Sequence, residues 1–375
     1  MFMIIYYYNV TSGTKNGGIE TFTRQLAKTT LKNHHQHKIQ IICAKEPSFQ
    51  PELPELHKRF FYINRRRFPG FGKRFAKMME RLSLIPNVIK HFNKTPPDII
   101  QINKPYDFIA AFIFKKLYKC KIVFRSGGTD FFLGDKIFKN TIDGWIANCK
   151  NNAKELSQHY NITPDIIFNG VDTNIFKPSQ NETNIRTKLN ISNDEIVLIT
   201  VGRLVGWKAH KYLLDAMAIC TQTIPTLKLF ILGDGPEKAN LQQQAIDLKL
   251  QNNIFFNGDT THSELLKFHK IADIFCITSL EDENCSNALL EAISSGLAII
   301  GSNGGAIPEV INDAGLITPM RDANALANAI KKLSLDLTLR QKLNQKARAR
   351  ALQYLDINKI SEQYLQYYQN LLDKN

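Results

Sequence analysis

The sequence predicts an α/β protein with two doubly wound parallel sheets. The chain has 375 residues, which is more than one ordinary hydrophobic core needs and fits two domains. Short runs rich in β-branched residues alternate with helical stretches in two series, separated by a segment rich in Asn, Thr and Pro. Such alternation is typical of βαβ units in a parallel sheet with helices on both faces. We therefore expect two domains, each with its own sheet, and a cleft between them.

Apolar runs mark the expected strands of each series. The strands of the first series are predicted over residues 2–9, 38–44, 98–102, 121–125, 144–149 and 165–169, with a helix over 19–33. Those of the second series are predicted over 195–203, 227–235, 253–259, 273–279 and 297–302. The intervening helices are predicted over 210–222, 238–248, 262–272 and 287–296. Crossovers of this length favour parallel pairing of the strands.

The turn-rich segment 169–184 is the predicted linker between the domains. It places an N-terminal domain at residues 1–170 and a C-terminal domain at 171–356. Two helical patterns close the chain, one over 323–354 with a break and one beginning at residue 357. We expect the last helix to cross back, so that residues 357–375 join the N-terminal domain.

The composition is that of a globular protein, with 43% hydrophobic and 22% charged residues. The first ten residues, MFMIIYYYNV, have neither the basic leader nor the small-residue cleavage site of a signal peptide. The uncharged apolar run 108–114 is far shorter than the roughly 20 residues that span a bilayer. The six cysteines form no CxxC pair, which favours reduced thiols in the core over disulfides or a zinc site. We expect a cytoplasmic protein.

Positive charge is concentrated in the N-terminal half. Up to Gly170 there are 27 Lys and Arg against 12 Asp and Glu, net +15, whereas the rest of the chain has 21 against 22, net −1. Residues 57–82 combine nine of these cations with six aromatic residues and one acid, Glu80. This mixture suits lipid headgroups or nucleic acid; the alternative is a solvated segment whose aromatic rings pack on their own domain. The predicted membrane or acceptor patch consists of Arg65, Arg66, Arg67, Lys73 and Arg74.

Two loops that follow predicted strands carry candidate ligand-binding residues. Ligands of open α/β sheets bind beyond the carboxyl ends of the strands, where loops enter helices. In NVTSGTKNGGIETF, Gly17 and Gly18 precede a helix and allow close approach of a ligand, although this is not a GxGxxG motif. In VGRLVGWKAH, Arg203 follows a strand and Lys208 begins the next helix. Two such cations would bind a diphosphate; the alternative is two solvated charges.

The segment EDENCSNALLE places four acids at another strand-to-helix turn. We expect the helix to begin at about Ser286, with the Ser286 hydroxyl as its N-cap. Glu283 then lies on the loop and Glu291 in the second helical turn, where both can accept hydrogen bonds from sugar hydroxyls. Glu281 and Asp282 are expected to be a solvated loop. The backbone amides expected to point at an anion are those of Asn287, Ala288 and Leu289.

Five segments together resemble the retaining glycosyltransferases of family 4, which have the GT-B fold of two facing Rossmann-like domains. In chain order, these segments are NGGIETF, FNGVDTNIFKP, GRLVGWKAHKYLLDA, LFILGDGPE and SLEDENCSNALLEAISSGLAIIGSNGGAIPEV. The last matches the E-x7-E signature of the family, with Glu283 as its first and Glu291 as its second glutamate. The resemblance covers nearly the whole chain.

The resemblance implies a role for each candidate residue. Arg203 and Lys208 would hold the donor diphosphate, Glu291 the ribose hydroxyls and Glu283 the transferred sugar, which makes Arg203, Lys208 and Glu283 the implied catalytic residues. Gly17 and Gly18 would approach the donor phosphate from the other domain on cleft closure. Because cations and a helix N-terminus neutralise the leaving diphosphate, we expect no metal and no cofactor besides the nucleotide-sugar substrate.

The sequence departs from the family pattern at three places. The loop RSGGTDFF lacks a histidine that contacts the donor sugar in many members, so Arg125, Ser126 or Asp130 is expected to take its place. Ala209 stands where Gly is usual. Asn284 and Ser286 stand where Gly and Pro are frequent, beside the expected sugar site, which leaves the donor sugar open.

The leading hypothesis is transfer of a sugar, most simply from a UDP-sugar, to a lipid-linked glycan. The basic segment favours work at the cytoplasmic face of the membrane, as in bacterial O-antigen or capsule polysaccharide assembly. A soluble acceptor is an alternative, as is a nucleotide-sugar 2-epimerase of related fold, which would release free sugar. A basic nucleic-acid-binding protein is a third alternative, but no nucleic-acid motif accompanies the charge, and we expect no nucleic-acid partner.

Overall fold

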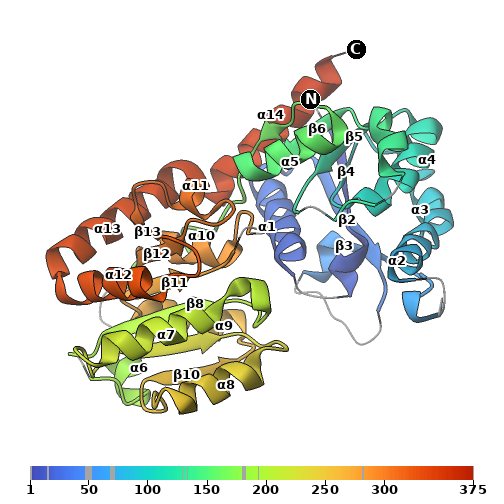
Figure 1. The fold of residues 1–375 in the computed structure, drawn as a ribbon. Coiled ribbons are helices and arrows are strands. Elements are labelled where there is room, and N and C mark those ends of the chain that lie inside the picture. The colour runs from blue at the N-terminus through green and yellow to red at the C-terminus, as the bar shows by residue number, and fades with distance from the viewer. Residues whose placement is uncertain are drawn as a thin grey trace. The chain divides into compact units, whose positions relative to one another are not determined.

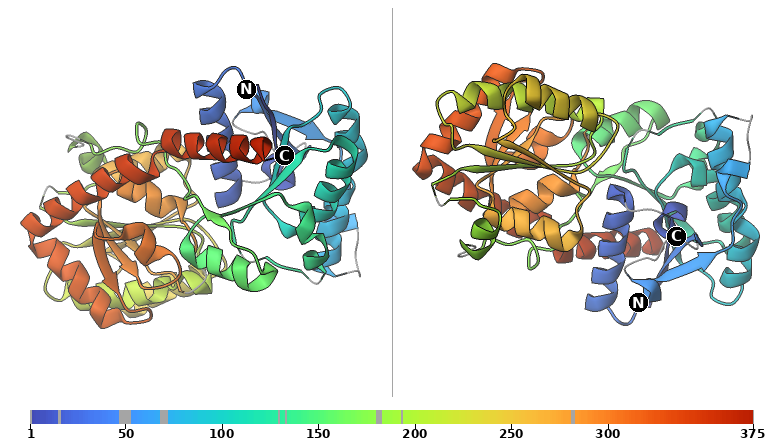
Figure 2. Two further views of the ribbon diagram at one scale, coloured as in Figure 1. Left: turned by 90° about the horizontal axis from the view of Figure 1, so that it is seen from above. Right: turned by 90° about the horizontal axis from the view of Figure 1, so that it is seen from below.

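The computed structural model describes residues 2–14, 17–46, 53–67, 72–128, 130–132, 134–179, 183–192, 194–280 and 283–374. It divides into two compact units, Met1–Gly170 with Ile357–Asn375, and Val171–Asp356. Each unit is an α/β domain that holds one parallel sheet between layers of helices (Figures 1 and 2). The predicted fold class is confirmed.

The first unit has a seven-stranded parallel sheet in the order β3-β2-β1-β4-β5-β6-β7. Its strands are β1 (Ile4–Tyr8), β2 (Lys38–Ala44), β3 (His57–Phe60), β4 (Ile99–Ile102), β5 (Lys121–Arg125), β6 (Gly144–Ala147) and β7 (Asp165–Ile166). Strand β3 was not predicted. It lies at the edge of the sheet inside the basic segment, and only its first residue is buried, so the run HKRF carries no apolar signal.

The helices of the first unit cover both faces of this sheet (Figure 1). They are α1 (Gly18–Asn33), α2 (Lys73–Leu82), α3 (Ile85–Phe92), α4 (Phe108–Tyr118), α5 (Lys150–Tyr160) and α14 (Ile357–Asp373). Helix α14 comes from the end of the chain and lies beside α1 in both views of Figure 2. The rings of Phe22 and Tyr364, 6.0 Å apart, join the two helices inside one core cluster.

The second unit has a six-stranded parallel sheet in the order β10-β9-β8-β11-β12-β13. Its strands are β8 (Val197–Val201), β9 (Lys228–Leu232), β10 (Ile254–Gly258), β11 (Ile274–Ile277), β12 (Ala298–Ser302) and β13 (Gly315–Thr318). Its helices are α6 (Thr183–Lys188), α7 (His210–Thr221), α8 (Lys238–Asp247), α9 (His262–Ile271), α10 (Asn287–Ser294), α11 (Ile307–Ile311), α12 (Ala323–Leu335) and α13 (Leu337–Arg350). Strand β13 was also not predicted.

The order of the second sheet reverses between β8 and β11, which are neighbours. This reversal is a topological switch point, where loops from adjacent strands turn to opposite faces and leave a crevice at the carboxyl ends. The loop after β8 carries Arg203 and Lys208, and the loop after β11 carries Glu283. The strand order thus brings together Lys208 and Glu283, which are 75 residues apart in the chain.

The predicted break in the helical pattern near the C-terminus falls at Asp336. Its side chain accepts a hydrogen bond of 2.8 Å from the Leu339 amide and so caps α13. Among the described residues, no helix has the length and apolarity needed to cross a bilayer.

Candidate functional site

Lys208 and Glu283 form an ion pair at the switch point of the second sheet. The ammonium of Lys208 contacts Oε2 of Glu283, and the two side chains are only 13% and 8% exposed. The hydroxyl of Ser279 donates to the same carboxylate oxygen at 2.5 Å. Both sequence-predicted residues therefore meet, and Ser279 is a third member that the sequence reading missed.

Backbone hydrogen bonds hold the two loops together around this pair. The Leu280 amide donates to the Trp207 carbonyl at 2.9 Å, and the Thr278 hydroxyl donates to the Lys208 carbonyl at 2.8 Å. A third loop joins them, because the Ala306 amide donates to the Glu283 carbonyl at 2.8 Å. The position of the ion pair is thus set by hydrogen bonds to main-chain carbonyl groups in loops at three strand ends.

Arg203 lies beside this pair in the chain but differs from Lys208 in its surroundings. It directly follows Gly202 at the end of β8, its side chain is exposed, and no described residue accepts a hydrogen bond from its guanidinium. The structure therefore leaves one cation of the predicted pair open to solvent and places the other against a carboxylate.

Two glycines of the segment LFILGDGPE pack against the loop that carries Arg203. A Cβ on Gly233 would lie 2.0 Å from the Gly202 carbonyl oxygen, and a Cβ on Gly235 would lie 2.3 Å from the Leu204 carbonyl oxygen. Neither position accepts a side chain without movement of the backbone. These glycines hold the turn after β9 against the loop after β8.

Helix α10 begins at Asn287, with Ser286 as its N-cap residue. The expectation that the Ser286 hydroxyl caps the helix is wrong, because that side chain makes no capping hydrogen bond. Asn287, Ala288 and Leu289 form the first turn, where backbone N–H groups have no intrahelical acceptor. A helix start of this kind is a favourable place for an anion.

Glu291 lies in the second turn of α10, as expected, and is 8% exposed. No described residue forms a hydrogen bond or ion pair with its carboxylate. Burial alone raises the pKa of Glu291 from 4.5 to about 8, because the ionised form loses its hydration without gaining a partner. A buried carboxyl group with no partner among the described residues can bind the hydroxyl groups of a ligand.

His210, next to the Lys208 turn, carries no positive charge at neutral pH. Burial and the nearby Lys208 ammonium lower its pKa from 6.5 to about 4. The positive charge at this strand end therefore comes from Arg203 and Lys208.

Glu281 and Asp282, the other acids of the segment EDENCSNALLE, lie outside the described residues.

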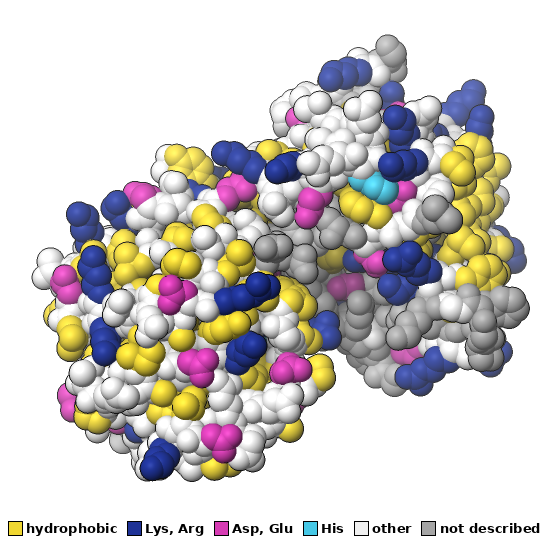
Figure 3. Space-filling model, viewed as in Figure 1, with side chains coloured by type: hydrophobic (Ala, Val, Ile, Leu, Met, Phe, Trp, Pro, Cys, Tyr) yellow, Lys and Arg dark blue, Asp and Glu magenta, His cyan; other side chains and the backbone are white. Residues whose placement is uncertain are grey.

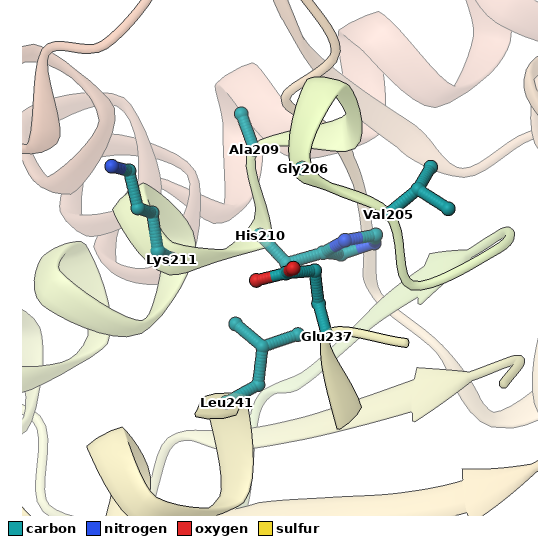
Figure 4. Close-up of a pocket in the computed structure, with 7 residues that line it drawn as sticks. All are labelled: Val205, Gly206, Ala209, His210, Lys211, Glu237 and Leu241. Atoms are coloured by element: carbon teal, nitrogen blue, oxygen red, sulfur yellow. The ribbon is translucent and has the colours of Figure 1, made fainter. Parts of the chain in front are cut away.

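A small cavity opens beside this turn. Figure 4 shows its walls, which come from the turn before α7, the start of α7 and the start of α8. Its volume of about 110 Å³ is well below the roughly 300 Å³ at which ligand pockets begin. It is lined by Val205, Gly206, Ala209, His210, Lys211, Glu237 and Leu241, so none of the predicted donor-binding residues borders it.

In the first unit, Gly17 is the N-cap residue of α1 and Gly18 is its first residue. A Cβ on Gly17 would lie 2.4 Å from Oε2 of Glu20. The Glu20 carboxylate is 3% exposed and accepts a hydrogen bond of 2.5 Å from the Thr11 hydroxyl. Gly17 therefore makes room for a buried glutamate, a residue that the sequence reading did not single out.

The three residues proposed to replace the family histidine occupy different surroundings. Arg125 is 1% exposed, stacks 4.5 Å from the Phe22 ring centroid and donates to the Asn169 side chain. Ser126 is fully buried and donates to the Gly128 carbonyl at 3.0 Å. Asp130 is 41% exposed and lies 3.3 Å from the Lys77 ammonium. Asp130 is therefore the most accessible of the three.

The described part of the basic segment exposes both cations and apolar side chains. Arg66, Arg67 and Arg74 are exposed, and Phe61 is 70% exposed. The side chains of Arg65 and Lys73 lie outside the described part. The segment also has a buried member, Arg81, whose guanidinium pairs with Asp107 inside the unit. Figure 3 shows hydrophobic side chains gathered over α3 and α4, with Lys and Arg side chains around them.

Two family profiles match the chain. The profile for glycosyl transferases group 1 covers residues 181–350, and that for glycosyltransferase family 4 covers residues 16–175. The chain belongs to glycosyltransferase family 4. The resemblance inferred from five sequence segments is thus confirmed, and both units of this family 4 protein are accounted for.

Curated relatives match part of this family 4 chain. The N-acetyl-alpha-D-glucosaminyl L-malate synthase of Bacillus anthracis is 28% identical over 214 residues, 56% of this chain and 55% of that protein. The D-inositol 3-phosphate glycosyltransferase of Mycobacteroides abscessus is 28% identical over 212 residues, 54% of this chain and 46% of that protein. The chain thus spans about half the length of the curated relatives it matches.

A solved structure matches the whole chain. The Anabaena HepE protein in complex with UDP has a TM-score of 0.80 at 20% identity, covering 99% of this chain and 100% of that chain. At this identity the likeness shows the fold, and it confirms the GT-B class.

The family departure at Ala209 has a visible backbone consequence. Ala209 has φ of +56°, in the left-handed region that favours the usual glycine. This strained residue lies between Lys208 and the start of α7.

Among the described residues, no group of three or more His, Cys, Asp or Glu side chains is arranged to hold a metal ion.

Proposed function

We propose that the protein is a retaining glycosyltransferase that moves a sugar from a nucleotide diphosphate donor, a UDP-sugar, to a glycan acceptor. The observation that carries this proposal is the ion pair of Lys208 and Glu283 at the switch point of the second sheet. The loop that carries Glu283 leads into helix α10, and α10 carries Glu291. Cations, a helix start and two carboxylates are the groups that a sugar diphosphate needs.

Each group has a distinct task in the proposed reaction. Arg203 and Lys208 bind the diphosphate, and the first-turn N–H groups of α10 add partial positive charge. These groups stabilise the negative charge that develops as the nucleotide diphosphate leaves, so the proposal includes no metal. Glu291 accepts hydrogen bonds from the ribose hydroxyls, and Glu283 binds the transferred sugar. The acceptor hydroxyl then attacks the oxocarbenium-like sugar on the face from which the diphosphate departs, and its proton passes to an oxygen of the leaving diphosphate. The glycosidic bond thus replaces the bond between sugar and phosphate.

The choice of a UDP-sugar rests on relatives and not on the site itself. The HepE structure is a complex with UDP, and the Bacillus anthracis relative is named N-acetyl-alpha-D-glucosaminyl L-malate synthase. Asn284 and Ser286, which replace the usual Gly and Pro, lie beside the proposed sugar position. They are the residues where we expect the donor sugar to be selected.

A thermal-shift screen against UDP-, GDP- and ADP-sugars tests the donor. A ligand at about 100 times its dissociation constant stabilises the folded protein by roughly 2.7 kcal/mol. We expect a shift with UDP-sugars and no shift with the uridine nucleoside. If none of the nucleotide sugars raises the unfolding temperature, the proposed donor class is wrong. Release of free sugar with a changed C2 configuration, without an acceptor, would favour the epimerase instead.

We further propose that the acceptor is lipid-linked and that the first unit docks on the inner face of the cell membrane, as in O-antigen or capsule polysaccharide synthesis. Two observations support this docking proposal. The chain up to Gly170 has a net charge of +15, and the side chains of Phe61, Ile63 and Phe75 are exposed in the same segment as exposed arginines. Aromatic rings enter the interface while the cations meet lipid phosphates.

Co-sedimentation with vesicles of anionic phospholipid tests the docking proposal. The test variant replaces Arg66, Arg67 and Arg74 by Gln, and we expect it to lose most vesicle binding. The control variant removes the same charge from exposed positions of the second unit and should bind like the unmodified protein; it replaces Lys188, Lys332 and Lys342 by Gln. Equal loss in both variants, or no binding by the unmodified protein, would remove the membrane argument.

A further inference from the structure

One carboxylate oxygen of Glu283 is shared by two donors. The Lys208 ammonium and the Ser279 hydroxyl both contact Oε2, the latter at 2.5 Å. The same ammonium lies 4.6 Å from the centroid of the Trp207 ring, within the range of a cation–π interaction. Lys208 is thus held between a carboxylate and an indole ring.

This arrangement sets a conflict for the proposed reaction. In the proposed reaction, Lys208 binds the donor diphosphate and Glu283 binds the sugar. In the structure, however, these two residues bind each other. An incoming diphosphate must therefore compete with Glu283 for the ammonium. Oε2 of Glu283 keeps the Ser279 hydroxyl as a partner after the exchange, because Ser279 is fully buried and lies on the loop of Glu283.

Trp207 is built into the site in a way that suits this exchange. It is 39% exposed, whereas the second tryptophan of the chain, Trp145, is only 9% exposed. Its backbone carbonyl accepts the Leu280 amide at 2.9 Å, so its main chain is fixed to the loop after β11. The ring attracts the ammonium without neutralising it, so the charge of Lys208 remains available to a phosphate.

We propose that Trp207 is a positioning residue for donor binding: it keeps the Lys208 ammonium at the strand end while a diphosphate replaces Glu283. The carboxylate that the exchange releases is then free to bind the sugar. No covalent step is involved, because Lys208 only exchanges the Glu283 carboxylate for the donor diphosphate as its ion-pair partner. This inference rests on the proposed function, because it assumes that Lys208 binds the donor diphosphate.

The test compares the affinities of the full-length protein for UDP and UMP by calorimetry. We expect Trp207→Leu to weaken UDP binding about tenfold, which is the size of a strong cation–π interaction, with a smaller effect on UMP. Trp207→Phe keeps an aromatic face and should retain most of the preference for UDP. A purely structural role of Trp207 would weaken both nucleotides alike.

Glu283→Gln is the second variant, and its expected effect on UDP affinity is opposite to that of Trp207→Leu. Removing the competing charge frees the ammonium, so UDP should bind at least as tightly as to the unmodified protein. Weaker UDP binding by Glu283→Gln, with thermal unfolding unchanged, would overturn the exchange. The same conclusion follows if Trp207→Leu leaves the UDP-to-UMP preference intact.

Lys208→Ala separates failure of this inference from failure of the proposed function. If Lys208→Ala binds UDP as well as the unmodified protein does, the donor site itself is misassigned. If Lys208→Ala weakens UDP binding but Trp207→Leu does not, the donor site stands and only the role of Trp207 is wrong.

Discussion

Replacing Glu291 by Gln should change how the stability of the protein depends on pH. Glu291 is 8% exposed and its pKa is raised from 4.5 to about 8 by burial. Between these two values the folded protein keeps a proton that the unfolded chain has released. Raising the pH through this range therefore destabilises the folded state, in contrast to the usual carboxylate with a lowered pKa.

The magnitude follows from the size of the shift. Each pH unit between 4.5 and 8 lowers the free energy of unfolding by up to about 1.4 kcal/mol, so the full range amounts to roughly 5 kcal/mol. Gln has the shape of a protonated glutamate but does not titrate. The stability of Glu291→Gln relative to the unmodified protein should therefore rise from pH 5 to pH 8 and level off above it.

Urea unfolding at pH 5, 6, 7, 8 and 9 measures this difference. Asp247→Asn is the control, because Asp247 is an exposed carboxylate of the same unit. A difference between Glu291→Gln and the unmodified protein that stays constant across the pH range would refute the reasoning. It would show that the Glu291 carboxylate is solvated or paired in solution.

Three further substitutions test the backbone and the buried charges. Ala209→Gly relieves a left-handed residue at φ +56° and should raise the free energy of unfolding by up to about 1 kcal/mol after the entropic cost of Gly; a loss of stability would contradict this. Gly233→Ala places a Cβ 2.0 Å from the Gly202 carbonyl oxygen and should cost more than about 2 kcal/mol in urea unfolding; a cost below about 1 kcal/mol would contradict this close packing of the two loops. Asp107→Ala leaves Arg81 buried without its carboxylate and should cost about 3 to 5 kcal/mol; a cost below about 1 kcal/mol would mean that Arg81 reaches water.

The fold could be predicted because most strands are continuous apolar runs between turn signals. Most residues of the runs KIQIICA and IVLITV are buried, so the apolar composition of these runs predicts strands. β3 and β13 could not be found in this way. β3 is a charged edge strand, and three of the four residues of β13 are only partly buried or exposed.

The site could be predicted only in part. Sequence alone puts Lys208 and Glu283 on loops after strands, but their contact depends on β8 and β11 being neighbours, which is a property of the strand order. Ser279, Trp207 and Glu20 were missed because single polar or aromatic residues carry no pattern. The side-chain partner of Arg125, Asn169, lies 44 residues away, so its burial was likewise invisible in the sequence.

Calorimetric titration of the intact protein with UDP tests the central claim, that the second unit binds the donor diphosphate through Lys208 and Glu291. The titration is repeated on Lys208→Ala and Glu291→Ala, with thermal unfolding to show that both variants remain folded. Losing a charged or buried hydrogen-bond partner should weaken binding by about 2 to 3 kcal/mol in each variant. Unchanged UDP affinity in both folded variants would contradict the account.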